Sequence, residues 1–141
     1  MIELDNQTED SFSIEKAEQI AATLSKRDIE LMLCDDNAIQ SINKEYRETD
    51  SPTDVLSFPL EGELEHMPLG SIVISVDKIN EKSIELGHTP QDELALLFIH
   101  GLLHLLGYDH ETDDGEMRAK ERELIEQFML PKSLIIRTEE S

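Results

Sequence analysis

Three histidines lie close together in one apolar segment, and their spacing suits a single metal ion. His100 and His104 are four residues apart, so on a helix both imidazoles project from the same face. His110 follows after Gly107, which allows the chain to turn back because glycine tolerates positive φ. Three protein ligands leave a fourth position for water, which is the pattern of catalytic zinc. We predict that His100, His104 and His110 bind one Zn²⁺ per chain, although imidazole also suits other divalent transition metals.

The surroundings of these histidines favour the metal over a structural explanation. A single histidine in an apolar helix is usually a core or surface residue with one hydrogen bond. Here three of the five histidines fall within residues 100–110, and two of them interrupt a leucine-rich face. Burying three unpaired imidazoles would cost free energy, whereas a metal satisfies all three. The other two, His66 and His88, show no ligand pattern, and we expect them in solvated loops.

The spacing also resembles the metzincin protease template, with one departure. In those proteases the residue after the first histidine is a glutamate that acts as general base, and here it is Gly101. Loss of such a base typically costs a factor of about 10²–10⁴ in rate. Peptide hydrolysis is therefore disfavoured, unless another carboxylate of the chain replaces the missing base.

The elements that must position these residues alternate between strand and helix patterns. The histidine pair falls on a helix that Thr89-Pro90 opens and Gly107 ends. Periodicity predicts further strands and helices, separated by a turn at 49–52 and an exposed loop at 60–69. We expect an α+β fold, with one domain over 1–141, a small mixed β-sheet packed with several α-helices, and the metal site at the end of a helix. The expected strands are 1–6, 29–34, 55–58 and 70–76, and the expected helices are 14–24, 36–46, 77–87, 90–107 and 114–129.

Composition narrows the function classes. The 141 residues suit one domain, and neither a signal peptide nor a membrane-spanning apolar run is present, so a cytoplasmic protein is expected. The single cysteine, Cys34, excludes an internal disulfide and is predicted to be a small buried residue. The net charge of −20 argues against general affinity for nucleic acid, but only weakly, because a cleft can have its own local field.

Residues 100–110 resemble the signature of the YbeY family of bacterial endoribonucleases. Two further segments agree in order and spacing, so the resemblance covers roughly 43–117. The first comprises Asn43-Lys44-Glu45-Tyr46-Arg47 and Pro52-Thr53-Asp54-Val55-Leu56-Ser57-Phe58-Pro59. The second is Leu69-Gly70-Ser71-Ile72-Val73-Ile74-Ser75, where the family usually has aspartate in place of Ser71.

The resemblance implies a single-strand-specific, metal-dependent endoribonuclease that matures ribosomal RNA, notably of the small subunit, and acts in ribosome quality control. Its implied partners are single-stranded RNA and the ribosome or small-subunit proteins. Zinc would be bound at His100, His104 and His110, and Arg47 matches a functionally important arginine. A guanidinium near a metal suits a phosphodiester, since it can hold two non-bridging oxygens. Without the resemblance, we would interpret Arg47 as a surface residue at a helix end, favoured by the helix dipole.

Two alternatives stay open at this point. One is a metal-dependent hydrolase of another substrate, peptide or small molecule, which an acidic chain would suit. The other is a ribosome-associated factor whose metal mainly holds the fold. If the family's usual aspartate acts as a base, Ser71 should weaken activity or move that role to Asp54 or Asp109.

Overall fold

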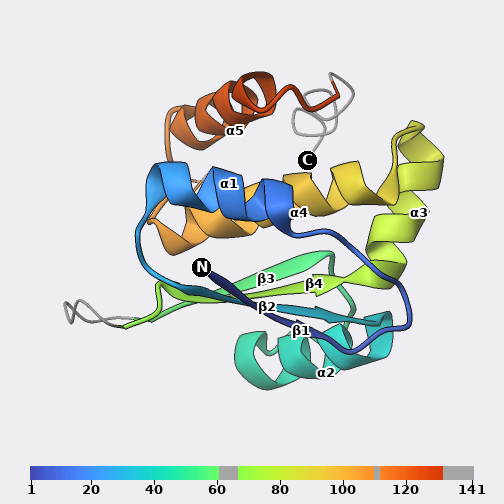
Figure 1. Cartoon of the computed structure of the whole chain (residues 1–141). Coiled ribbons are helices and arrows are strands. Elements are labelled where there is room, and N and C mark those ends of the chain that lie inside the picture. Colours follow the sequence, from blue (N-terminus) through green and yellow to red (C-terminus); the bar gives the residue numbers. More distant parts are fainter. Residues whose placement is uncertain (61–66, 110–111, 132–141) are drawn as a thin grey trace.

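Four short strands form one mixed sheet at the centre of the molecule (Figure 1). A computed structural model describes residues 1–60, 67–109 and 112–131. The strand order is β1-β2-β4-β3, in which β1, β2 and β4 are parallel and β3 is antiparallel to β4. The predicted mixed sheet is therefore confirmed. The strands are β1 (Ile2–Asn6), β2 (Ile29–Cys34), β3 (Val55–Pro59) and β4 (Gly70–Ser75).

Helices cover both faces of this sheet, because parallel strands need crossover connections that return the chain to the same end. Helices α1 and α4 lie on one face and α2 lies on the other, while α5 packs on α4 (Figure 1). The described residues form a single α+β domain, as predicted. The helices are α1 (Glu15–Leu24), α2 (Asp36–Arg47), α3 (Val76–Leu86), α4 (Pro90–Leu105) and α5 (Glu116–Gln127).

Helix α4 is the central helix of the fold and is buried on nearly all sides. A capping box at its start joins Thr89 and Asp92, each side chain accepting from the other residue's backbone N–H. The helix is apolar all round because the sheet, α1, α3 and α5 surround it. It ends at Leu105, and Gly107 follows with φ of 100°, so the predicted turn after the helix is confirmed.

On the other face of the sheet, α2 covers a smaller apolar cluster that includes Cys34 and Ile39. Helix α2 begins at Asp36 as predicted, and Asp35 caps it by accepting from the backbone N–H of Ala38. Burial, with contributions from Asp35 and two nearby aspartates, raises the pKa of the Cys34 thiol to about 11. Cys34 is therefore a buried structural thiol, as expected.

The prediction that His88 lies in a solvated loop is wrong. His88 does not lie in solvent: its side chain is 2% exposed and its Nε2 lies 2.6 Å from Oε2 of the fully buried Glu93. The reason is local geometry, because Gly87 ends α3 with positive φ and turns His88 back against the first turns of α4. His66 and most of the predicted 60–69 loop lie outside the described residues. None of the described helices is long and apolar enough to cross a membrane.

Candidate active site

A cleft of about 330 Å³ brings Arg47 together with His100 and His104, which lie far from it in the sequence. The histidines come from the last turns of α4, the arginine comes from the end of α2, and strand β3 forms the wall between them. The structure thus unites three of the four predicted site residues. The residues that line the cleft are Arg47, Val55, Leu56, Ser57, Pro59, His100 and His104.

Both imidazoles are oriented by hydrogen bonds at Nδ1. His100 Nδ1 lies 3.0 Å from Oε1 of Glu121, and His104 Nδ1 lies 3.0 Å from the carbonyl oxygen of Tyr108. A carboxylate and a carbonyl can only accept, so each Nδ1 carries the proton and donates it. In the neutral rings Nε2 is then the atom with an available lone pair, which is the form a metal requires.

The two Nε2 atoms face each other at 3.2 Å. Two imidazole ligands at zinc bond lengths of about 2.0–2.1 Å, held at a tetrahedral angle, would be about 3.3 Å apart. The observed separation therefore fits two ligands of one ion. His110, the third predicted ligand, lies outside the described residues, and within the described ranges no group of three histidine, cysteine or acidic side chains is close enough to hold a metal.

Glu121 is a site residue that sequence reasoning missed. Its side chain comes from α5, is 4% exposed, and accepts the hydrogen bond from His100. A signal for it was available in the helical pattern, since Glu121 lies on the same buried stripe as Met117, Leu124 and Ile125. A carboxylate on a buried stripe needs a partner, and that partner is His100.

Arg47 is fixed in place from two sides. Its Nη2 donates to the carbonyl oxygen of Ser57 at 2.6 Å, and its guanidinium carbon lies 5.2 Å from the centre of the Phe58 ring. Both contacts are with β3, the strand that lines the cleft. The guanidinium is therefore held over the strand edge beside the histidines, with further N–H donors for a ligand.

The free edge of β3 has several of its backbone groups occupied or missing. The pairing with β4 turns Val55, Ser57 and Pro59 outward. Val55 N–H donates to Oδ1 of Asp54 at 2.8 Å, the Ser57 carbonyl accepts from Arg47, and Pro59 has no N–H. This outer edge of the sheet is consequently blunted along the side of the cleft.

Gly101 has a packing role. A Cβ at this position would lie 2.9 Å from Cγ2 of Ile72 and 3.2 Å from Oγ of Ser57, whose hydroxyl donates to the Gly101 carbonyl at 3.1 Å. The position therefore faces the sheet instead of the cleft. A glutamate here, as in the metzincin template, would have no room, so the sequence argument against a protease base gains a steric reason.

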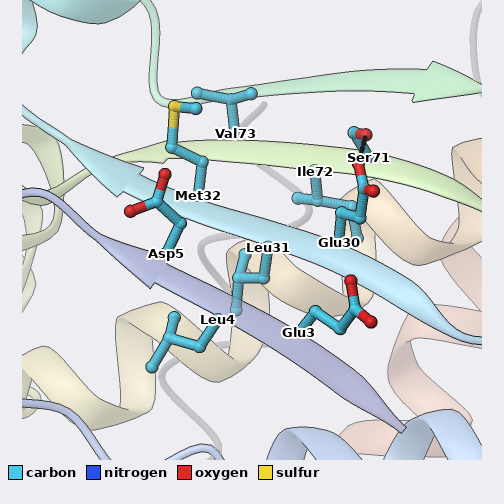
Figure 2. A pocket seen from close by; sticks show the side chains of 9 residues that line it. All are labelled: Glu3, Leu4, Asp5, Glu30, Leu31, Met32, Ser71, Ile72 and Val73. Atoms are coloured by element: carbon cyan, nitrogen blue, oxygen red, sulfur yellow. Dashed lines mark hydrogen bonds between the residues drawn. The ribbon is translucent and has the colours of Figure 1, made fainter.

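Ser71 lies on the other face of the sheet from the histidines. Its neighbour Ile72 contacts Gly101 of α4, so strand alternation directs Ser71 to the α2 side. There its hydroxyl donates to Oε2 of Glu30 at 2.8 Å, within a second cleft of about 290 Å³ whose rim includes Glu3 and Asp5 (Figure 2). The side chain at position 71 accordingly lies away from the reaction site.

Comparison with known proteins agrees with this arrangement. A family model described as Endoribonuclease YbeY matches residues 2–129. The chain belongs to the YbeY family. A YbeY relative from Sulfurovum sp. is 60% identical over 144 residues, which cover 99% of this chain and 98% of the relative. A second YbeY relative, from Nautilia profundicola, is 56% identical over 140 residues, which cover 99% of this chain and 100% of the relative.

The YbeY fold assignment also has support from a solved structure. A solution structure of a Thermotoga maritima protein matches with a TM-score of 0.66 and 32% sequence identity, over 91% of this chain and 89% of that one. The arrangement of sheet and helices described above is therefore shared with an experimentally determined relative.

Proposed function

We propose that the chain is a zinc-dependent endoribonuclease that cleaves single-stranded RNA, with His100, His104 and His110 as metal ligands and Arg47 as the phosphate-binding residue. Its substrate is ribosomal RNA, notably that of the small subunit, and its partners are the ribosome or small-subunit proteins in the cytoplasm. The descriptions of its YbeY relatives support the ribonuclease activity. The motif resemblance supports the metal and the ribosomal substrate.

One observation carries the proposal: two histidine Nε2 atoms at metal-ligand separation share a cleft with a fixed guanidinium. A zinc ion, when bound, supplies a Lewis acid and lowers the pKa of a nearby water. A guanidinium recognises the two non-bridging oxygens of a phosphodiester through paired N–H donors. These are complementary requirements of phosphodiester cleavage, and the placement of the histidines and Arg47 in one cleft supports the proposal.

The chain's own residues have separate tasks in this site. Arg47, held by Ser57 and Phe58, orients the phosphate and stabilises the charge that develops on it. The acceptors Glu121 and Tyr108 keep Nδ1 of each histidine protonated, so that Nε2 stays directed into the cleft. Because these acceptors are already in place, little reorganisation is required when the substrate binds.

The peptidase alternative loses support because Gly101 packs against the sheet and leaves no space for a base. The alternative of a mainly structural metal differs from the proposal in one measurable respect. A structural metal would be needed for folding, whereas α4 and the sheet form an apolar core that does not include the metal site. Under the proposal, metal removal abolishes cleavage and leaves the circular dichroism spectrum largely unchanged.

The deciding experiment is cleavage of a fluorescent single-stranded RNA by zinc-loaded protein, with His104→Ala and Arg47→Ala variants prepared in parallel. We expect His104→Ala to lose zinc and nearly all activity, and Arg47→Ala to keep zinc and lose a factor of about 10² or more in rate. Lys82→Ala removes a partly exposed cation on α3 that is paired with Glu85; it is the matched control and should cleave normally.

Contaminating ribonuclease is distinguished by the variants, because it would persist in His104→Ala preparations. Cleavage that survives both substitutions, or a wild-type protein that binds zinc and leaves RNA intact, would overturn the proposal. Mass analysis of the new RNA ends then distinguishes attack by water from attack by the ribose 2′-hydroxyl.

A further inference from the structure

Tyr46 is the one aromatic side chain of this protein that stands largely in solvent. All six aromatic residues lie within the described ranges, and of these only Tyr46 is exposed, at 64%. Its position is immediately before Arg47, in the last turn of α2. An aromatic ring that is mostly uncovered contributes little to the core, so packing alone does not account for it.

Phe58, on the α2 side of β3, lies between this ring and the guanidinium of Arg47. The rings of Tyr46 and Phe58 meet edge to face, with centroids 5.5 Å apart and planes at 66°. The guanidinium of Arg47 lies 5.2 Å from the same Phe58 centroid. Tyr46 and the phosphate-binding group are therefore separated by no more than the sum of these distances, around the free edge of β3. A nucleotide spans a comparable length from its phosphate to its base.

The charge of the molecule makes a non-ionic contact with RNA necessary. With 12 basic residues against 32 acidic ones, the chain cannot rely on many lysine and arginine contacts with phosphates. Lys44, one turn before Arg47, is close to Asp50 at 3.9 Å. Stacking of bases on aromatic rings provides affinity that does not depend on net charge, worth about 1–3 kcal/mol per base.

We propose that Tyr46 is a stacking platform for a nucleobase that neighbours the phosphate held by Arg47. This inference rests on the proposed ribonuclease function and assigns it a base-binding subsite. The platform explains a preference for single strands, since a base within a duplex is already stacked and paired and would have to be extruded to reach the ring. Because every base has an aromatic face, the subsite selects unpaired structure without selecting sequence.

The test compares Tyr46→Leu and Tyr46→Phe with the full zinc-loaded wild-type chain. Tyr46→Leu keeps an apolar side chain of good helix propensity and removes the aromatic face, whereas Tyr46→Phe keeps the ring. Two readouts are used: the Kd for a single-stranded RNA, measured on ice by fluorescence anisotropy, and KM and kcat for its cleavage. Ile84→Ala, an exposed apolar residue on α3, is the matched control.

We expect Tyr46→Leu to raise both Kd and KM about tenfold with little change in kcat, and Tyr46→Phe to stay within about twofold of wild type. A second set of RNAs carries one abasic nucleotide at successive positions around the cleavage site. At one of these positions the missing base should weaken RNA binding by the wild type about tenfold. The same abasic RNA should bind Tyr46→Leu with unchanged affinity.

The inference is overturned if Tyr46→Leu binds and cleaves like wild type, if Tyr46→Phe is equally impaired, or if no abasic position is coupled to residue 46. An effect of Tyr46→Leu that appears only in kcat also overturns it, because a stacking platform acts on binding. Failure of the proposed function is a separate result, namely that wild type does not cleave RNA. The anisotropy measurement still tests the platform in that case.

Discussion

The orientation of the two histidines in α4 depends on Glu121 and Tyr108, which are not among the residues that line the cleft. His100 donates to Glu121 on α5, and His104 donates to the Tyr108 carbonyl just beyond its own helix. The first contact joins two elements, and the second is local to the end of α4. Hydrogen bonds of this kind fix the tautomer and raise the basicity of the ligand nitrogen.

A Glu121→Gln variant should therefore bind zinc more weakly than wild type. The amide can still accept from Nδ1 but lacks the negative charge, so we expect the zinc Kd to rise by a factor of about 10–100. Competition with a chromophoric chelator measures this directly on metal-free protein. Glu123→Gln, at a more exposed position two residues further along α5, is the matched control and should leave the Kd unchanged. Equal zinc affinity in all three proteins would contradict an orienting role.

Residue types and spacing were sufficient to predict the histidine pair, because two residues four apart on a helix must share a face. Arg47 was predicted only through the family resemblance, since an arginine at a helix end is usually a surface residue that the helix dipole favours. Its approach to the cleft depends on the pairing of β3 with β4, which no local pattern specifies. For Glu121 the helical pattern indicates a buried carboxylate that needs a partner, but the partner itself is 21 residues away and lies across a helix interface.

At the scale of elements, the site depends on how closely α4 approaches the sheet. Gly101 allows this approach, with Ile72 of β4 and Ser57 of β3 directly against its backbone. His100, next to Gly101, and His104, one turn later, then line the same cleft as β3 and Arg47. A larger side chain at position 101 would push the end of α4 away from β3 and β4.

Gly101→Ala should consequently destabilise the protein, although alanine is the better helix former. Overpacking costs about 1–3 kcal/mol and the propensity gain offsets roughly 1 kcal/mol, so we expect a net loss in the free energy of unfolding. In an Ile72→Ala background the clash is relieved, and the same change should become neutral or stabilising. Urea denaturation of the four proteins measures the sign reversal, and a loss of equal size in both backgrounds would contradict the steric explanation.

The order and type of the elements could be predicted because capping residues and periodicity are local. Asp35 and Thr89 begin helices as expected. The start of α3 was misplaced, since Ser75 is the N-cap and Asp77 lies in the first turn. Both residue types suit a cap, and the choice follows from the end of β4. The burial of His88 similarly depends on a tertiary contact with Glu93.

At the scale of the whole molecule, the charge of −20 sets the conditions under which RNA can be bound. Long-range electrostatics oppose the approach of a polyanion, so affinity must come from a few local contacts in and beside the cleft. Under the proposed function Arg47 would supply one such contact, and the acidic surface would disfavour RNA that does not reach it. Selectivity of this kind is gained at the expense of association rate.

Binding of single-stranded RNA should therefore depend only weakly on salt. With one or two phosphate contacts, the plot of log affinity against log salt concentration should have a slope between about −0.7 and −1.4. Fluorescence anisotropy across a salt series on wild type and Arg47→Ala checks this, and the substitution should reduce the slope by about 0.7. A wild-type slope near −4 would instead indicate an extended cationic surface.

The contact of Arg47 with the outer edge of β3 has a consequence for self-association. Exposed strand edges are templates for pairing with other chains, and the guanidinium occupies the Ser57 carbonyl on such an edge. Replacement by a short side chain would uncover that acceptor and favour strand-to-strand self-association. Loss of activity in an Arg47 variant is thus interpretable as chemistry only for preparations that run as a single species in size-exclusion chromatography. If Arg47 binds phosphate as proposed, one side chain serves both RNA binding and solubility, and few replacements can satisfy both requirements.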